Sequence, residues 1–271
     1  MFIVKDKMKK NFREELYDYI PPSLRRKKAD PFIKAKFSPF WMMIWDFFVS
    51  QMISRRFYSI RIKNLKHYDA IDPDAATIFY AQHNCWWDGI IGYYLCRNIL
   101  KVPMNIMVED LIKFPLLANV GAFSVDKKSP KSTLHVVNYC ADFLTKEKIN
   151  LWLFPQGVIK PPNHRPLEFQ KGLTYIAQKC KKINLIPVAV QYPFVRQGLP
   201  EVLIDMGKPI FLDKDINRSE YTAFLENDFT NMLENQLTEI SNGEIYKYEI
   251  FWRKADGFGK TLEKIFKNRI K

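Results

Sequence analysis

Short, largely apolar runs separated by segments with helical periodicity occupy most of the sequence after Thr77. Five such runs lie at residues 77–81, 104–108, 122–125, 150–154 and 184–190. Near-continuous apolar runs of this length are typical of strands that are covered on both faces. Strands that alternate with helices form a mixed or mostly parallel sheet flanked by helices. The sequence therefore predicts an α/β fold with such a central sheet.

The segments between these runs carry the signals of helices. One of them has an apolar helical face made by Leu134, Val137, Ala141 and Leu144. Ser129 and Pro130 precede this face as a typical N-cap and first-turn pair. The same periodicity predicts a second helix near residues 173–177 and a longer one at 224–237.

The most apolar stretch of the chain, residues 39–53, comes before the alternating region. It is shorter than the ~20 residues that a helix needs to cross a bilayer. Its polar residues Asp46, Ser50 and Ser54 recur every four positions and line one narrow stripe of a helix. An ordinary buried helix can have this pattern, and so can a helix that lies in a membrane interface with its aromatic side chains in the lipid. We expect the interfacial helix.

The formal net charge of +13 favours an anionic partner. Nucleic acid or a membrane with anionic lipids would satisfy that charge. The aromatic content of 15%, which includes six Trp, is typical of proteins at a bilayer interface. The basic block at residues 25–28 could rest on anionic headgroups or belong to a solvated arm. Because no nucleic-acid-binding module is recognisable, we expect an anionic membrane surface and no nucleic acid as the partner.

These patterns divide the chain into a basic arm with a membrane-associated helical segment at 1–58 and an α/β domain at 59–271. The N-terminus lacks the apolar core and the cleavage site of a secretory signal. The expected location is therefore the cytoplasmic face of a membrane, with peripheral or monotopic attachment. The spacing of the four cysteines fits neither a zinc site nor a compact disulfide framework, so reduced thiols are expected. Because the sequence has no metal-ligand spacing and no Gly-rich phosphate loop, we expect no metal and no cofactor.

His83 and Asp88 stand at a predicted corner, where a strand ends near Ala81 and a helix begins near Asp88. Residues five apart lie about 140° apart around a regular helix, but a strand–turn–helix corner can fold them together. The carboxylate can then hold one imidazole nitrogen while the other nitrogen faces a substrate hydroxyl. At this spacing alone, a structural histidine is the more common explanation of such a pair.

Three later segments of the sequence add motifs that support a catalytic role for this pair. In the segment Gly121–Lys127, a predicted strand ends in an acidic and a basic residue, Asp126 and Lys127. Phe154–Gly157, which reads Phe-Pro-Gln-Gly, ends the next strand in a turn where glycine permits unusual backbone angles. Leu185–Val188 places a proline within an apolar strand. All three follow the His-Asp element in order.

In this combination the chain resembles the glycerolipid acyltransferase family, whose best-known members are the 1-acylglycerol-3-phosphate acyltransferases. That family carries His-x-x-x-x-Asp, then Gly-x-x-x-(Ile/Val)-Asp-Arg, then Phe-Pro-Glu-Gly, then an apolar strand with Pro-Val. The resemblance covers residues 60–210 and implies that His83 is the catalytic general base and Asp88 its catalytic partner. The family reaction is a direct transfer without an acyl-enzyme, so Cys85, which lies between them, is read as a filler of the turn.

The resemblance also implies a set of acceptor-binding residues in and after the later motifs. These are Gly121, Asp126, Lys127, Gln156, Gly157, Lys160 and Lys171. Two of them depart from the family pattern. Lys127 replaces the usual Arg, which keeps the charge but loses the bidentate fork that suits phosphate. Gln156 replaces the usual Glu and removes a negative charge, and Lys160 could supply a further cation.

The activity that the resemblance implies is transfer of a fatty acyl group from acyl-CoA or acyl-carrier protein to a hydroxyl of a membrane lipid. Lysophosphatidate or a related lysophospholipid is the expected acceptor. The departures at Lys127 and Gln156 leave open an acceptor without phosphate, such as a glycolipid. They also leave open a catalytically inactive homologue that holds lipid.

Overall fold

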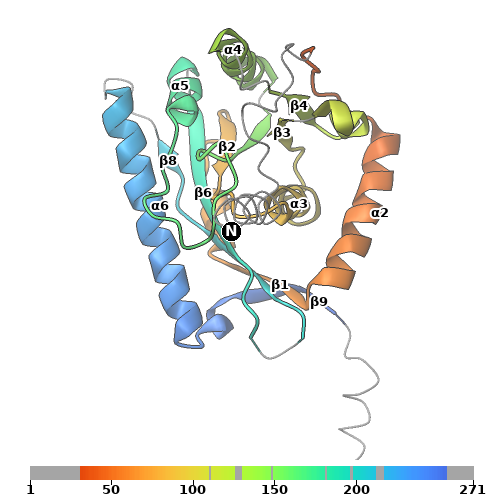
Figure 1. The fold of residues 1–271 in the computed structure, drawn as a ribbon, viewed down its shortest axis with the longest axis vertical. Coiled ribbons are helices and arrows are strands. Elements are labelled where there is room, and N and C mark those ends of the chain that lie inside the picture. Colours follow the sequence, from red (N-terminus) through yellow and green to blue (C-terminus); the bar gives the residue numbers. More distant parts are fainter. Residues whose placement is uncertain are drawn as a thin grey trace, which may run out of the picture.

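The structure is a computed structural model that describes residues 31–109, 111–125, 130–147, 149–180, 182–195, 198–211 and 217–254. In this part of the chain, nine strands form one sheet with the order β4-β3-β5-β2-β6-β7-β1-β9, and β8 pairs with β6 beside that path. Helices flank the sheet (Figure 1). The predicted mixed, mostly parallel α/β sheet with flanking helices is therefore confirmed.

All five predicted strands are present, and their bounds differ from the prediction by no more than one residue. They are β2 (Ala76–Tyr80), β3 (Asn105–Val108), β4 (Ala122–Ser124), β5 (Asn150–Leu153) and β6 (Ile183–Gln191). These strands are parallel to their neighbours in the set. Every residue of β2, β5 and β6 is buried, as the apolar runs predict. Four strands were not predicted: β1 (Ser59–Lys63), β7 (Val202–Met206), β8 (Ile210–Phe211) and β9 (Glu249–Arg253).

The helices lie where the periodic segments predict them. They are α2 (Pro39–Arg56), α3 (Trp87–Tyr94), α4 (Pro130–Glu147), α5 (Gly172–Lys179) and α6 (Arg218–Ser241). A π-helical turn, η3 (Leu95–Leu100), extends α3. Short 3-10 turns lie at η2 (Leu65–Ala70), η4 (Leu111–Lys113), η5 (Pro115–Asn119) and η6 (Ile245–Lys247). The long helix α6 starts before the predicted range because the Asn217 side chain accepts a hydrogen bond from the Ser219 amide and caps it.

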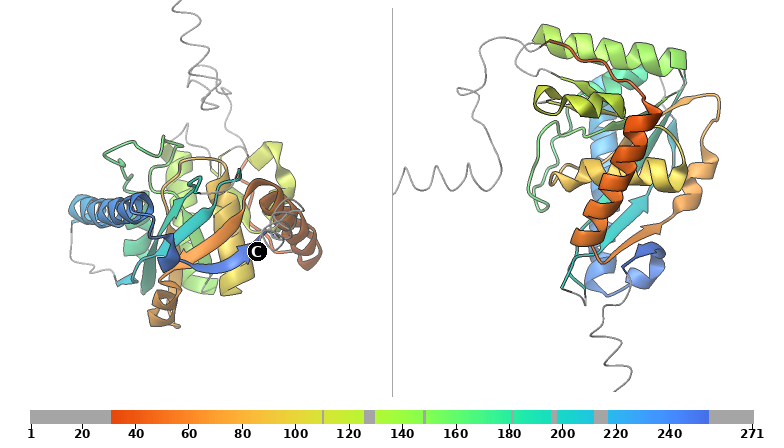
Figure 2. Two further views of the ribbon diagram at one scale, coloured as in Figure 1. Left: turned by 90° about the horizontal axis from the view of Figure 1, so that it is seen from below. Right: turned by 90° about the vertical axis from the view of Figure 1, so that its right-hand side faces the viewer.

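Two apolar clusters cover the two faces of the sheet. On one face, side chains of α4, α5 and α6 pack with Ile78 and Tyr80 of β2. On the other face, side chains of α2 and α3 pack with Phe79 of β2 and Trp152 of β5. Figure 2 shows the strands between α6 on one side and α2 on the other. Alternate residues of β2 therefore serve opposite layers, as a strand covered on both faces requires.

Strand direction reverses between β6 and β7, which are antiparallel. The next strand, β1, is parallel to β7, and β9 is antiparallel to β1. The carboxyl ends of β2, β5 and β6 therefore share one edge of the sheet with the amino ends of β7 and β1. His83 follows β2 at this edge, which we call the His83 edge.

Pro187 lies at an irregularity of β6, in line with its effect on strand pairing. On one side β6 pairs with β2 up to Pro187. On the other side it pairs with β8 at Asn184 and Leu185, and with β7 from Val188 onward. The proline, which has no backbone N–H, thus falls in the gap between two partner strands.

The helix α2 places an apolar surface toward solvent. Phe40, Met43 and Phe47 are 60%, 64% and 62% exposed, whereas Val49 and Ile53 on the other side of the helix are buried in the core. Large side chains at these spacings lie on one helical face. No helix within the described ranges is long and apolar enough to span a bilayer.

Of the predicted polar stripe of α2, Asp46 faces the protein, whereas Ser50 is exposed and its hydroxyl donates to the Asp46 carbonyl. Asp46 accepts hydrogen bonds from the Tyr93 hydroxyl at 2.7 Å and from an Arg97 guanidinium nitrogen at 3.0 Å. Asp46 therefore ties α2 to α3 and η3, while Trp41 and Trp45 of the same helix pack against the core. The predicted boundary at residue 58 stays a prediction, and the basic block at 25–28 lies outside the described residues.

Candidate active site

The predicted corner brings His83 and Asp88 together. The chain leaves β2, turns through residues 81–86, and enters α3 with Asp88 in its first turn. The imidazole Nδ1 of His83 lies 3.1 Å from Oδ2 of Asp88. Since an ionised carboxylate can only accept, Nδ1 carries the proton and Nε2 has the free lone pair. No described residue forms a hydrogen bond to Nε2, and the His83 side chain is 21% exposed.

Asp88 is buried, and its carboxylate is well supplied with donors. Oδ2 also accepts hydrogen bonds from the backbone amides of Asn84 and Cys85, at 2.6 and 2.8 Å. Oδ1 accepts a hydrogen bond from the Tyr192 hydroxyl at 2.8 Å. Buried carboxylates persist where such donors replace water. The donors therefore fix one orientation of the carboxylate beneath the imidazole.

Two residues of the Phe-Pro-Gln-Gly segment hold His83 from the next strand. The ring of Phe154 stacks on the imidazole with a centroid distance of 4.0 Å and an interplanar angle of 7°. The Gln156 side-chain oxygen accepts a hydrogen bond from the His83 amide at 2.6 Å. A glutamate could accept the same bond, so Gln156 keeps the acceptor and removes a charge. An aromatic face also stabilises a cation, and protonation of His83 creates one.

Gly157 and Lys160 shape the loop that follows. The Gly157 amide donates to the Phe154 carbonyl at 3.0 Å, and its φ of +69° is a value that glycine adopts readily. The Lys160 amide donates to the His83 carbonyl at 2.8 Å, so this loop packs against the histidine backbone. The Lys160 ammonium forms an ion pair with Glu168. This hydrogen bond and charge hold the pKa of Glu168 below its ordinary value.

The other predicted acceptor residues are not all brought to the histidine. Gly121 precedes β4 and so lies at the edge opposite the His83 edge. A Cβ there would lie 2.2 Å from the Met104 carbonyl oxygen, at a φ of +98°. Lys171 is exposed at the start of α5. Asp126 and Lys127 lie outside the described residues, and acceptor binding by all of these residues stays a prediction.

Cys85 is not poised to act as a nucleophile. Burial and the neighbouring Asp88 carboxylate raise the pKa of its thiol to about 12. A thiol needs a depressed pKa to react as a thiolate at neutral pH. The four cysteines, all within the described residues, form no disulfide with one another.

Sequence reasoning missed Tyr192, because it lies 104 residues from Asp88. Burial and the Asp88 charge hold its pKa well above the ordinary value, so its hydroxyl stays protonated and can donate. The signal available in the sequence is its position directly after the apolar strand β6. Its ring also stacks on Phe57 at a centroid distance of 5.7 Å.

A buried carboxylate that orients a histidine at the carboxyl ends of parallel strands is an arrangement suited to general-base catalysis. The described residues contain no group of three or more His, Cys, Asp or Glu side chains placed to hold a metal ion. The pair, the fold and the order of motifs are those that the resemblance to acyltransferases predicts.

Comparison with known proteins agrees with this class. Residues 59–191 match the family model described as Acyltransferase. The fold is similar to the crystal structure of the 1-acyl-sn-glycerophosphate (LPA) acyltransferase PlsC from Thermotoga maritima. The TM-score is 0.50 and the identity 15%, over 72% of this chain and 79% of that one. No curated protein matches the sequence significantly. Over residues 59–191 the chain is therefore similar to the Acyltransferase family, and its fold is similar to that of PlsC.

Proposed function

We propose that this protein transfers a fatty acyl group from a thioester donor, acyl-CoA or acyl-carrier protein, to a hydroxyl of a membrane lipid. Lysophosphatidate or a related lysophospholipid is the proposed acceptor. The observation that carries the proposal is the hydrogen bond between His83 Nδ1 and the buried Asp88 carboxylate, which leaves Nε2 available as a base.

In this mechanism Nε2 of His83 removes the proton of the acceptor hydroxyl as its oxygen attacks the thioester carbonyl carbon. Asp88 and the Phe154 ring stabilise the imidazolium that forms. The tetrahedral intermediate collapses and breaks the carbon–sulfur bond. The imidazolium returns its proton to the departing sulfur, so the products are an ester and a free thiol. No covalent acyl-enzyme is needed, in line with the raised pKa of Cys85.

The test is release of free thiol from acyl-CoA and from acyl-carrier protein in the presence of lysophosphatidate vesicles. His83→Ala should abolish transfer, with a loss of at least about 100-fold, while the far-UV spectrum and melting temperature stay close to those of the parent. If the protein binds the lipid but releases no thiol, it is an inactive lipid-binding homologue and not an enzyme. Near-normal transfer by a folded His83→Ala variant would refute the proposed base.

An acceptor without phosphate is the second candidate, and one observation favours it. The Lys160 ammonium, a cation beside the site, is already paired with Glu168. A neutral headgroup would not need to displace that carboxylate. Parallel assays with lysophosphatidate, a monoacylglycerol and a glycolipid separate the two candidates. A preference for the neutral acceptors would overturn the lysophospholipid assignment and keep the transferase.

We further propose that the protein acts at the cytoplasmic face of a membrane and that α2 is its contact. The exposed side chains Phe40, Met43 and Phe47 would enter the interface, and Arg55 and Arg56 at the end of the helix would lie near anionic headgroups. Removal of α2 is a poor test, because the same helix buries Val49 and Ile53. Point substitutions on the outer face leave that packing in place.

A further inference from the structure

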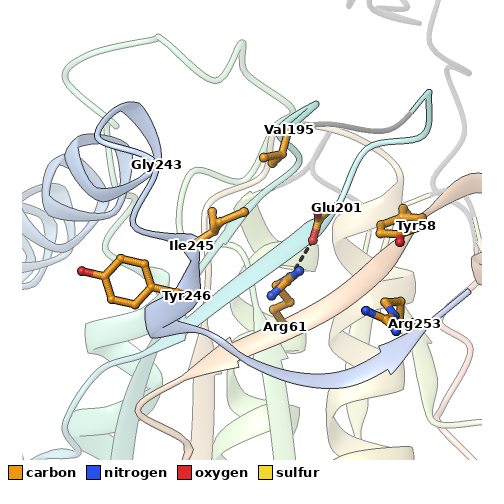
Figure 3. A pocket seen from close by; sticks show the side chains of 8 residues that line it. All are labelled: Tyr58, Arg61, Val195, Glu201, Gly243, Ile245, Tyr246 and Arg253. Carbon is orange, nitrogen blue, oxygen red and sulfur yellow. Dashed lines mark hydrogen bonds and ion pairs between the residues drawn. The ribbon is translucent and has the colours of Figure 1, made fainter. Parts of the chain in front are cut away.

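A pocket of about 400 Å³ lies at the His83 edge, beyond the candidate active site (Figure 3). Its walls come from β1, from β9, from the segment that follows α6, and from the loop between β6 and β7. Arg61 and Arg253 contribute guanidinium groups, and Tyr58 and Tyr246 contribute rings. The acyltransferase mechanism above uses none of these residues.

Strand register places the pocket on the same edge as His83. Ser59 at the start of β1 pairs with Arg253 at the end of β9. The next residue of β1, Ile60, pairs with Val202 of β7, and the neighbouring Leu203 pairs with Gln191 at the end of β6. Between β2 and β1 stand β6 and β7, so three strand spacings, about 14 Å, separate the strands that carry the two sites.

The loop after β6 connects the two sites directly. Tyr192 in this loop donates to Asp88, and Val195 lines the pocket. Three residues of chain span at most about 11 Å. Phe194, which lies between them, is 72% exposed. A long, thin ligand could therefore reach from His83 to the pocket along this loop.

The two arginines of the pocket differ in whether a carboxylate neutralises their charge. Glu201 is buried, and it accepts a hydrogen bond from Arg61 Nε at 2.6 Å and one from the Ser59 hydroxyl. This carboxylate offsets the charge of Arg61 and fixes its side chain. Arg253 is exposed, and within the part of the chain that the structure describes it has no hydrogen-bond or ion-pair partner. The pocket therefore offers one uncompensated guanidinium, the group that best matches phosphate oxygens.

The rings of the pocket offer a second kind of contact. Tyr246 is 75% exposed, more than any other large apolar or aromatic side chain in the described residues, although it sits at a pocket wall. An exposed aromatic face stacks readily on a planar base. Ile245 and Val195 add apolar surface around it. Phosphate and a planar base are the two parts of a nucleotide.

We propose that this pocket binds the phosphorylated adenosine end of an acyl-CoA donor, with Arg253 at the phosphates and Tyr246 on the adenine. The proposal rests on the proposed transfer from a thioester. In this arrangement the thioester lies at His83, the pantetheine arm follows residues 192–195, and the nucleotide occupies the pocket. It selects coenzyme A, and not a carrier protein, as the donor.

A soluble nucleotide fits this position better than a lipid headgroup. Arg61 and Arg253 extend from the sheet face opposite the one that buries Ile60 and Trp252 with the α2 layer. The helix α2 packs on the same face as Ile60 and Trp252, and it lies across the sheet from α6 (Figure 1). A membrane in contact with α2 would leave the pocket accessible from water.

The test compares two donors that differ only in the nucleotide, palmitoyl-CoA and palmitoyl-pantetheine. In the parent protein the ratio of their kcat/KM values should favour palmitoyl-CoA, and Arg253→Gln should lower this ratio about 10-fold by raising KM for palmitoyl-CoA. Lys254→Gln is the matched control, because it removes a neighbouring exposed charge that does not line the pocket. An unchanged ratio in folded Arg253→Gln overturns the proposal.

Direct binding supplies a readout that does not depend on turnover. Adenosine 3′,5′-bisphosphate should bind the parent protein in calorimetry, and Arg253→Gln or Tyr246→Ala should weaken it about 10-fold. Equal competition by inorganic phosphate or by anionic vesicles would overturn the nucleotide assignment. Transfer from acyl-carrier protein with none from palmitoyl-CoA would overturn this inference and leave the transferase standing. Failure with every thioester, despite bisphosphate binding, would instead overturn the proposed function.

Discussion

The Tyr192 hydroxyl donates a hydrogen bond to Oδ1 of Asp88 at 2.8 Å, while Oδ2 of the same carboxylate accepts from His83. A residue at the end of β6 is thus joined to the proposed base through one shared carboxylate. The hydroxyl spreads part of the carboxylate charge away from the imidazole and limits rotation of the carboxylate. Tyr192 is in this sense a positioning residue.

Tyr192→Phe removes that hydroxyl and keeps the ring that packs on Phe57. We expect kcat to fall about 10-fold, since a hydrogen bond to a charged group contributes about 1.5–3 kcal/mol and the remaining donors retain part of it. Without the hydrogen bond from Tyr192, more of the Asp88 charge acts on His83, so the carboxylate should stabilise the imidazolium more strongly. The acidic limb of the kcat/KM profile should therefore move to higher pH, a shift that a loss of stability would not produce.

Tyr93→Phe is the matched control for that experiment. Tyr93 of α3 also donates to a carboxylate, that of Asp46 on α2, and this hydrogen bond does not involve the His83–Asp88 pair. Its variant should leave the pH profile of the parent unchanged. A shift of the same size in both variants would contradict a specific role for Tyr192.

Asp88→Asn tests the charge of the carboxylate apart from its shape. The amide oxygen can occupy the Oδ2 position and accept from His83 and from the amides of Asn84 and Cys85. The amide nitrogen then faces the Tyr192 hydroxyl, which can turn to accept. We expect a stable protein with a kcat lowered by at least about 100-fold, because the imidazolium loses its counter-charge. Thermal unfolding beside the thiol-release assay checks both parts, and a variant with parent activity would show that orientation suffices.

Gly121→Ala tests whether the glycine of the second motif is structural. An added Cβ would meet the Met104 carbonyl oxygen at 2.2 Å with a φ of +98°. We expect a loss of roughly 3 kcal/mol in the free energy of unfolding, measured with denaturant. Gly172→Ala at the start of α5, where a Cβ meets nothing within 4 Å, should change stability by less than about 1 kcal/mol. Equal effects at both positions would refute the close approach at Gly121.

Cys85 should resist alkylation in the folded protein. With a thiol pKa of about 12, the thiolate fraction at pH 8 is about one in ten thousand, and it grows only as the pH rises toward that value. Iodoacetamide at pH 8 should label Cys85 much more slowly than in the unfolded chain, as peptide mass spectrometry can measure. Cys85→Ala should retain most transfer activity. Rapid labelling together with loss of activity would instead revive a cysteine nucleophile.

The outer face of α2 should determine membrane binding. Phe47→Glu places a charge in the proposed interface and should lower flotation with anionic liposomes at least about 10-fold. Phe224→Glu is the control, because Phe224 is 52% exposed on α6, away from α2. Since neither side chain is buried, melting temperatures should stay within a few degrees of the parent. Undiminished flotation of Phe47→Glu would contradict the proposed contact.

The central strands could be predicted because burial on both faces leaves a continuous apolar run, as in β2 and β5. The outer strands carry a weaker signal. In β1 the apolar residues Ile60 and Ile62 alternate with charged ones, and β9 is largely exposed. A search for apolar runs passes over such strands, although their pairing sets the width of the sheet.

The His83–Asp88 contact could be predicted because it is local: five residues and one corner determine it. The stacking of Phe154 and the hydrogen bond from Tyr192 could not, since they depend on which strands become neighbours of β2. The sequence also gave no sign that Glu168 would pair with Lys160. Contacts of this kind follow from sheet order and loop path, which a single sequence leaves open.

The reversal of strand direction between β6 and β7 makes one edge of the sheet from two parts of the chain. The family match ends at Gln191, where β6 ends, and most of the pocket lies after it. Insertions or replacements near Val195 or Tyr246 would leave the register of β2, β5 and β6 unchanged. Exchange of those segments between proteins of this fold should therefore alter substrate preference. It should leave the His83–Asp88 pair and the strands that position it unchanged.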